Sequence, residues 1–305
     1  MSDISAQAAS AGHRALRAPA DRSRAIALAL GIIGVITLTG MIGVLALRRE
    51  EAPTSLVLAT TTSARDTGLL DHLVPLVRES LRIEMRYVAV GSGQALEYGR
   101  RCDADVLMTH SPAAEQAFMD QGYGDSRKEV FYNEYVLVGP ESDPAGLHGT
   151  HNGTAALRLI HDFGARFATR GDSSGTHVAE QRLWAQAGFD YSTEINVPSN
   201  SWYVNVSAGM LVTMQRAAEL EAYTLADTGT WYAKEGSLDL ALHVDGDPRL
   251  FNQYSVVTLS EAKCPGVAHG AARAFQEWIA SSAGQEAVGK FEVNGRQLFH
   301  PNAKP

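Results

Sequence analysis

The sequence predicts an α/β protein of two lobes that follows an N-terminal membrane-spanning helix. The chain has 305 residues, more than a single hydrophobic core usually holds. From residue 55 onward, apolar segments of strand and helix character alternate, which is typical of a sheet covered by helices on both faces. Residues 25–47 form one uncharged, mostly apolar run.

The apolar run Ala25–Leu47 is long enough to cross a bilayer, because it gives about 34 Å of helix. Four Arg precede this run, and the two Arg that follow it are directly followed by Glu50 and Glu51. This bias predicts that residues 1–24 are cytoplasmic and that the rest is exported. A cleaved signal peptide is the alternative, although the run exceeds a usual signal core. The sequence favours an uncleaved anchor.

The exported part is acidic. Residues 1–52 hold six of the 26 Lys and Arg and four of the 34 Asp and Glu, so the remainder carries a net charge of about −10 with His neutral. No basic surface for nucleic acid is expected. Any anion site must therefore be local, built from dipoles and one or two Arg.

The first lobe is predicted over residues 54–139. A buried strand at Ser55–Ala59 runs into a polar loop at Thr60–Ser63, and the helical stripe that follows is interrupted by Pro75, which should kink or shift the helix. Strands in "RIEMRYVAVG" and "ADVLMTH" alternate with helices in "GQALEYGRR" and "PAAEQAFMDQ". This order predicts a parallel sheet, in which ligands bind beyond the carboxyl ends of the strands.

The second lobe is predicted over residues 140–244, after the extended segment "EVFYNEYVLVGP", and residues 245–305 return to the first lobe. The expected second-lobe elements are helices in "TAALRLIHDFGAR", "THVAEQRLWAQAG" and "GMLVTMQRAAEL" and strands in "RFATR", "YVNV" and "AYTLAD". The return segment is expected to end in one helix, "AARAFQEWIASSAGQEAVGKF". Two lobes joined by two crossovers form a cleft that can close on a small ligand.

The chain has two cysteines, Cys102 and Cys264. An exported pair of thiols tends to be oxidised, which favours a disulfide, but two separately buried thiols fit the sequence as well. The sequence leaves both arrangements open.

The stretch "RGDSSGTH", residues 170–177, supports three hypotheses. Its RGD tripeptide lies between an apolar strand and a helix start, not at a loop tip, so an adhesion role is rejected. A serine hydrolase would use Ser173 or Ser174 with His177 as base and Asp172 as acid. However, the G-x-S-x-G turn of such enzymes is missing.

The third hypothesis is an anion cradle. Gly171 and Gly175 allow tight turns and close approach of the backbone, and the helix that starts near residue 176 directs free N–H groups into the loop. Arg170 adds a permanently charged fork. Hydroxyl donors are supplied by Ser173, Ser174 and Thr176. An ordinary helix cap would need only one of these hydroxyls.

The four hydroxyl residues Thr60–Ser63 pose the same question at another strand end. One of them would be enough to cap a helix, and a second cradle that faces the first across a cleft is the alternative. The histidines lack the short spacings of zinc or iron ligands, so no metal site is predicted. The stretch Gly91–Gly93 fits either a site loop or a plain turn.

The motifs "LATTTSARDTGLL", "VGSGQAL", "DADVLMTHSPAAE", "RGDSSGTH", "AYTLADTGT" and "GDPRLFNQYSVV" resemble, in this order, the tungstate-binding periplasmic proteins of the Tup type, which feed ABC transporters. The resemblance covers roughly residues 54–300. It implies a type II periplasmic binding protein fold, with a ligand cleft between two lobes and one tetrahedral oxyanion held there. It also implies a monomer without cofactor, on the periplasmic or outer face of the membrane, whose partners are a permease and its ATPase.

The resemblance assigns the residues of the site. The ligand-binding positions are Thr61, Thr62, Ser63, Arg170, Ser174 and Thr176. The supporting positions are Gly171, Asp172, Ser173, Gly175 and His177. Three features depart from the family pattern: Thr228 stands where the family has Arg, "SAGML" at 207–211 replaces a glycine-rich stretch, and no lipidated cysteine lies near the apolar run.

The ligand class follows from the donors. Tungstate, molybdate and sulfate are fully deprotonated near neutral pH and only accept hydrogen bonds, whereas phosphate keeps a proton and needs an acceptor. Asp172 is the one acid in the loop and is expected to brace it. The alternatives are a molybdate, sulfate or phosphate carrier, an anchored oxyanion sensor and, more remotely, the serine hydrolase.

Overall fold

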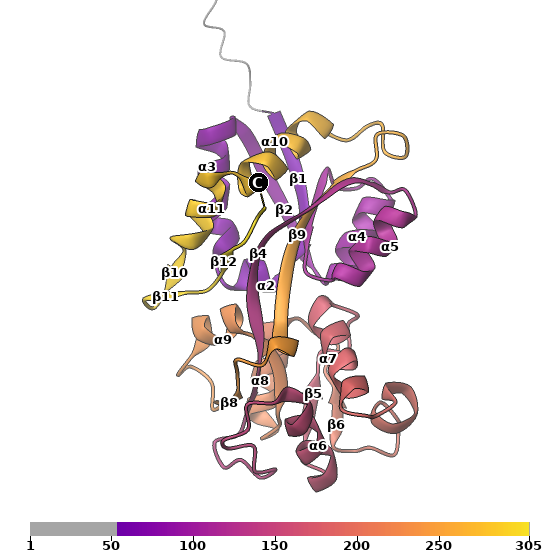
Figure 1. The fold of residues 1–305 in the computed structure, drawn as a ribbon, viewed down its shortest axis with the longest axis vertical. Helices are drawn as coiled ribbons and strands as arrows, with labels where there is room; N and C mark the ends of the chain where they lie inside the picture. Colours follow the sequence, from indigo (N-terminus) through magenta and orange to yellow (C-terminus); the bar gives the residue numbers. More distant parts are fainter. Residues whose placement is uncertain (1–53, 305) are drawn as a thin grey trace, which may run out of the picture. The chain divides into compact units, whose positions relative to one another are not determined.

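The computed structural model describes residues 54–304, and Figure 1 shows their fold. Residues from Pro53 onward form one compact unit. The predicted anchor at residues 25–47 and the segment before it lie outside the described residues. Within residues 54–304, no helix combines the length and the apolar character that a membrane crossing requires. The lobe bounds expected from the sequence stay predictions.

The first lobe is built on a mixed sheet. Its elements in chain order are β1 (Thr54–Thr61), α2 (Thr62–Asp66), α3 (Leu69–Leu81), β2 (Ile83–Val90), α4 (Ser92–Arg100), β3 (Val106–Thr109), α5 (Pro112–Asp120) and the first part of β4 (Gly124–Gly139). The return segment adds β9 (Phe251–Leu259), α10 (His269–Ala280), α11 (Ser282–Gly289), β10 (Glu292–Val293), β11 (Arg296–Gln297) and β12 (His300–Pro301).

The strand order is β2-β1-β3-β9-β4-β12. β1 pairs in parallel with β2 and β3, as the strand-helix alternation predicts. The predicted parallel sheet is confirmed for these three strands only, because the return strand β9 is antiparallel to both β3 and β4 and makes the sheet mixed. The physical reason is topological. β4 leads from the first lobe to the second, and β9 brings the chain back, so the two strands run in opposite directions.

Both faces of this sheet are buried. Along β1, Leu56 and Leu58 pack in one core cluster, and Val57 and Ala59 contact the other. Residues of α3, α10 and α11 complete the first cluster, and those of α4 and α5 complete the second (Figure 1). This period-two alternation explains why the strand segments of the sequence are apolar without interruption.

The second lobe contains α6 (Gly153–Phe163), β5 (Phe167–Thr169), α7 (Gly175–Gln186), β6 (Tyr203–Asn205), α8 (Met210–Glu219), β7 (Thr224–Asp227), α9 (Thr228–Lys234) and β8 (Ala241–Val244). Two single turns, π-helical Tyr191–Ile195 and 3₁₀-helical Pro248–Leu250, complete the list. The strand β4 belongs to both lobes, because its first part pairs with β9 and its last part with β7 and β8. Figure 1 shows β4 and β9 as the two long strands that pass between the lobes.

α3 is continuous over Leu69–Leu81 with Pro75 inside it, so Pro75 does not interrupt the helix, and the kink expected there stays a prediction. One detail corrects the sequence predictions. The expected single C-terminal helix is two helices, because Ser281 has an extended backbone and its hydroxyl accepts a hydrogen bond from Gly284 N–H, which caps α11. Gly284 also packs against the carbonyl of Trp278, where a side chain would not fit.

A disulfide joins Cys102 and Cys264, which resolves the choice that the sequence left open. It connects the turn after α4 to the segment between β9 and α10, across 162 residues of sequence. Such a long closed loop removes much conformational freedom from the unfolded chain.

Candidate oxyanion site

Two loops that follow strands of different lobes form the candidate site. We call residues 60–63, where β1 passes into α2, the threonine loop, and residues 170–177, between β5 and α7, the arginine loop. Both lie where the lobes meet. A Cβ built on Gly209 of the second lobe would lie 3.4 Å from Thr62 Oγ1, and one on Gly91 of the first lobe would lie 3.3 Å from Ser174 Cβ.

The threonine loop presents four unpartnered hydroxyls. The side-chain oxygens of Thr60, Thr61, Thr62 and Ser63 are buried and have no hydrogen-bond partner. Thr61 is the N-cap residue of α2, yet its side chain makes no capping hydrogen bond. The helix-cap interpretation is therefore wrong here. Buried hydroxyls without partners are costly, so four in succession indicate a ligand that accepts hydrogen bonds.

Arg170 supplies the charge of the arginine loop and is only 2% exposed. One terminal nitrogen donates to Asp172 Oδ2 at 2.6 Å, and the other lies 3.5 Å from Thr176 Oγ1. Its Nε is buried without a partner. The guanidinium therefore keeps its Nε–H free for a further acceptor, while Asp172 fixes its position.

The backbone of the arginine loop needs glycine at Gly171. This residue has a φ of +59°, and an added Cβ would clash with the side chain of Asn205. Ser173 also has a left-handed φ of +56°. Asp172 accepts a hydrogen bond from Ser174 N–H at 3.1 Å, and the Ser174 hydroxyl accepts from His177 N–H, which caps α7. Asp172 thus braces the loop, as the sequence suggests.

Burial alone would raise the pKa of Asp172, but the Arg170 charge and the hydrogen bonds from Ser174 lower it below its ordinary value. Asp172 is therefore an ionised partner of Arg170 at neutral pH. The opposite charges of Arg170 and Asp172 cancel, so the pair adds no net charge to the arginine loop.

His177 holds the loop from behind. Its Nδ1 accepts a hydrogen bond from Ser173 N–H at 3.0 Å, and its Nε2 lies 2.8 Å from the Tyr191 hydroxyl. The network continues from Tyr191 to Tyr203 at 3.0 Å and from Tyr203 to Glu180 at 2.6 Å. Burial lowers the pKa of His177, so the ring is neutral and fits one donor and one acceptor.

This use of His177 leaves the hydrolase hypothesis without a base. A serine nucleophile needs a free imidazole nitrogen within hydrogen-bond reach of its hydroxyl. Here Nδ1 is occupied by the Ser173 backbone, and the Ser174 hydroxyl meets the His177 backbone instead. Among residues 54–304, no group of three or more His, Cys, Asp or Glu is placed to hold a metal ion.

The structure adds residues that the sequence analysis did not assign to the site. The Thr60 hydroxyl, like those of its neighbours, has no hydrogen-bond partner, and Gly209 lies against Thr62. His110, which follows β3, touches Gly175: an added Cβ there would lie 2.7 Å from His110 Nδ1. The end of a third parallel strand is the signal that could have drawn attention to His110.

Known proteins resemble this chain over the same region. Residues 48–283 match the model of the PBP superfamily domain. Tungstate-binding protein TupA of Peptoclostridium acidaminophilum is 41% identical over 84% of this chain and 88% of its own length. The solved tungstate-binding protein TupA of Desulfovibrio alaskensis G20 is 44% identical over 82% of this chain and all of its own, with a TM-score of 0.70. The chain belongs to the TupA family of the PBP superfamily.

Tungstate-binding protein TupA of Campylobacter jejuni is a further relative, 36% identical over 79% of this chain and 89% of its own length. The α/β fold is thus that of the solved TupA structure.

Two of the departures from the family pattern have a structural role. The Thr228 hydroxyl accepts a hydrogen bond from Glu134 N–H at 3.2 Å, which ties α9 to β4. In the stretch 207–211, Gly209 is the N-cap residue of α8.

Proposed function

We propose that this protein is the extracytoplasmic binding component of an ABC transporter and that its ligand is tungstate. The TupA relatives support the ligand, since their names state that they bind tungstate. The six ligand-binding positions proposed from the sequence, three in each loop, would hold the anion through hydroxyl, amide and guanidinium donors.

The observation that carries this proposal is the set of buried donors without partners. Four hydroxyls of the threonine loop and the Nε of Arg170 lack hydrogen bonds, and the two loops belong to different lobes. A tetrahedral oxyanion has acceptors in all directions, so it can satisfy donors that converge from two sides. The contacts of Gly91 with Ser174 and of Gly209 with Thr62 support a closed arrangement of the lobes.

The donors favour a fully deprotonated anion over phosphate. A phosphate site needs an acceptor for the remaining proton, and the Asp172 carboxylate in the loop already accepts from Arg170 and Ser174. Tungstate, molybdate and sulfate share the required chemistry, and the TupA relatives favour tungstate among them. Molybdate or sulfate transport and oxyanion sensing are the alternatives.

Isothermal titration calorimetry of the purified protein with tungstate, molybdate, sulfate and phosphate tests the proposal. Tungstate is expected to bind the most tightly, with one site per chain. Tight sulfate or phosphate binding without tungstate binding would refute the assignment. Labelling of Ser173 or Ser174 by an active-site phosphonate would revive the hydrolase alternative.

The location and partners belong to the same proposal. Residues 25–47 would anchor the protein on the outer face of the cytoplasmic membrane, and the loaded monomer would deliver its anion to a permease driven by an ATPase. Membrane fractionation of the full chain and of a variant that lacks residues 1–52 tests the anchor. Release of the full chain in soluble, shortened form would indicate signal cleavage instead.

A further inference from the structure

His110 is a buried titratable residue with an unexplained nitrogen. The side chain is 3% exposed, and its Nε2 has no hydrogen-bond partner. The ring stacks on Tyr254, with ring centroids 4.7 Å apart. The Tyr254 hydroxyl lies near Thr61, and neither of these two buried hydroxyls has a hydrogen-bond partner. His110 therefore contacts the arginine loop at Gly175 and, through Tyr254, neighbours the threonine loop.

A chain of hydrogen bonds determines which nitrogen of His110 carries the proton. The Asp227 carboxylate can only accept hydrogen bonds, so the group that faces it at 3.3 Å is the amide nitrogen of Asn133, Nδ2. The Asn133 oxygen then accepts from Asn252 Nδ2 at 2.6 Å, which turns the Asn252 oxygen toward His110 Nδ1 at 2.9 Å. His110 Nδ1 is therefore the donor, and Nε2 of the neutral ring holds a bare lone pair.

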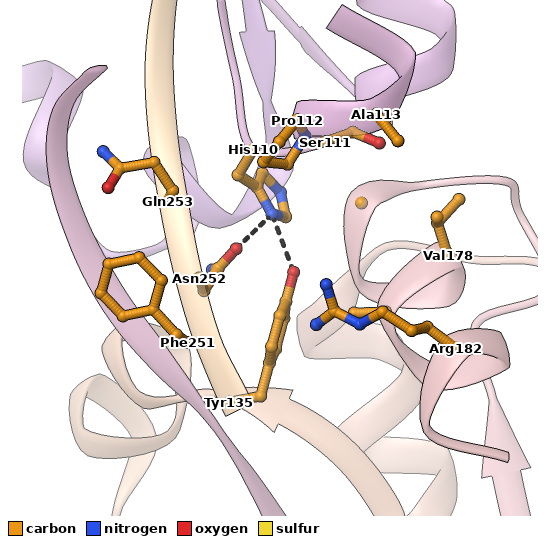
Figure 2. A pocket seen from close by; sticks show the side chains of 12 residues that line it. His110, Ser111, Pro112, Ala113, Tyr135, Val178, Arg182, Phe251, Asn252 and Gln253 are labelled. Atoms are coloured by element: carbon orange, nitrogen blue, oxygen red, sulfur yellow. Dashed lines mark hydrogen bonds between the residues drawn. The ribbon is translucent and has the colours of Figure 1, made fainter. Parts of the chain in front are cut away.

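This chain runs through the hinge between the lobes. Asp227 ends β7 in the second lobe, Asn133 and Asn252 lie on β4 and β9, and His110 follows β3 in the first lobe. Figure 2 shows the last step, in which Asn252 and the Tyr135 hydroxyl both approach the same nitrogen of His110, at 2.9 and 3.0 Å. The orientation of the ring is thus fixed by groups outside the two loops.

We propose that His110 Nε2 belongs to the oxyanion site and takes up one proton from solvent when a fully deprotonated oxyanion such as tungstate binds. The inference rests on the proposed function. A bare lone pair would repel an anion that has only acceptors, whereas a protonated Nε2 donates a hydrogen bond and adds a positive charge. Because Arg170 is already paired with Asp172 at 2.6 Å, the imidazolium would add a positive charge beyond that of this neutralised pair.

The charges around His110 support proton uptake on binding and not before it. Burial, and next the charge of Arg170, lower the pKa of His110 to about 4, against the smaller opposite effects of Asn252 and Asp172. The other titratable groups that border it are Tyr135 and Tyr254, whose pKa values burial raises, so both are neutral at pH 7. A bound dianion reverses this balance and raises the pKa of His110.

A cavity adjoins His110. His110 lines a cavity of about 300 Å³ between the lobes, together with Arg182 and the residues drawn in Figure 2. Phe251 and Val178, which also line this cavity, are 44% and 40% exposed. Arg182 also lies on it and opposes a charged imidazole in the free protein.

Calorimetry of the full chain with sodium tungstate, in two buffers of different ionisation enthalpy, counts the protons. Between pH 7 and pH 9, we expect about 0.5 to 1 proton taken up per anion and an affinity that falls by up to about tenfold per pH unit. His110→Gln keeps an amide donor but cannot titrate, so proton uptake should fall to near zero and the affinity should vary little with pH. His151→Gln, whose parent side chain is 81% exposed, is the matched control and should behave as the parent.

A second variant decides the matter if His110→Gln does not fold. Asn252→Asp places a carboxylate at Nδ1 and charges the ring before the anion arrives, so tungstate should bind with less proton uptake. Tungstate binding by the parent without proton uptake would overturn the inference and leave the proposed function intact. Uptake that persists in folded His110→Gln would do the same. Absence of binding for all four oxyanions would overturn both.

Discussion

Gly175 and His110 are in contact across the boundary between the two lobes. A Cβ built on Gly175 would lie 2.7 Å from both the Nδ1 and the carbonyl oxygen of His110, closer than real side chains come. Gly175 is the first residue of α7 and follows Ser174. The close approach of these two residues therefore depends on the absence of a side chain at Gly175.

Gly175→Ala should weaken tungstate binding without destabilising the free protein. Overpacking by one methyl group costs about 1–3 kcal/mol, so the affinity should fall about 5- to 150-fold. Alanine also has a higher helix propensity than glycine, so the substitution should not lower the stability of α7 when the lobes are apart. Calorimetry and thermal unfolding without ligand measure the two effects. Gly270→Ala in α10 is the control, because nothing lies within 4 Å of its added Cβ; an unchanged affinity of Gly175→Ala would show that closure does not require the contact.

Arg170→Lys should lose most of the affinity for tungstate although the charge remains. Lysine has no planar fork, so it cannot hold Asp172 and present a second N–H at the position of Nε. The loss of one hydrogen bond to a charged group corresponds to about 1.5–3 kcal/mol, or roughly 10- to 150-fold weaker binding. Arg216→Lys, on the exposed Arg216–Glu219 pair of α8, is the matched control. Calorimetry that gives equal affinities for Arg170→Lys and the parent would remove Arg170 from the site.

The fold was largely predictable because its signals are local. Strand-helix alternation and apolar periodicity give β1, β2 and β3 and the helices between them. The direction of β9 was not predictable in this way, because it depends on a return from the second lobe and not on residues of β9 itself. The break between α10 and α11 depends on a serine cap inside an apolar helical pattern, which periodicity hides.

The candidate site, like the fold, has parts that local sequence signals predict and parts that depend on tertiary contacts. Hydroxyls, glycines and an arginine that follow strands are visible in the sequence, so both loops could be proposed. His110 could not, because its position depends on Asn133 and Asn252 in two distant strands. The support of His177 by Tyr191 is likewise tertiary, since Tyr191 lies in a π-helical turn that no propensity indicates.

Thr61→Val should leave the free protein at least as stable as the parent and weaken binding. The Thr61 hydroxyl has no partner, so its replacement by a methyl group of similar size removes no hydrogen bond and relieves an unsatisfied buried group. Thermal unfolding with and without tungstate measures both effects, and the rise of Tm caused by tungstate should shrink. Thr224→Val is the contrast: its hydroxyl donates to the Ala168 carbonyl at 2.8 Å, so this variant should lose about 1 kcal/mol and keep the tungstate effect. Equal behaviour of the two variants would contradict the prediction.

Glu180→Gln should change how stability depends on pH. Burial raises the pKa of Glu180 from 4.5 to about 7, against hydrogen bonds from Tyr203, Thr169 and Trp184. The folded protein therefore binds the proton more tightly than the unfolded chain. This contribution to stability is complete below pH 4.5 and is lost as the pH rises toward 7. Between pH 5 and pH 8, the parent should lose about 2–3 kcal/mol of unfolding free energy relative to Glu180→Gln.

Urea unfolding of both proteins at pH 5, 6, 7 and 8 measures this difference, and Glu141→Gln, at an exposed position, should follow the parent curve. Parallel curves for the parent and Glu180→Gln would show that the carboxyl is ionised in both states.

The result also concerns the site, because Glu180 ends the hydrogen-bond network that starts at Ser173 N–H and passes through His177. If the network positions the arginine loop, Tyr191→Phe, which breaks it between His177 and Tyr203, should weaken tungstate binding at every pH tested, while the slope of stability against pH stays that of the parent.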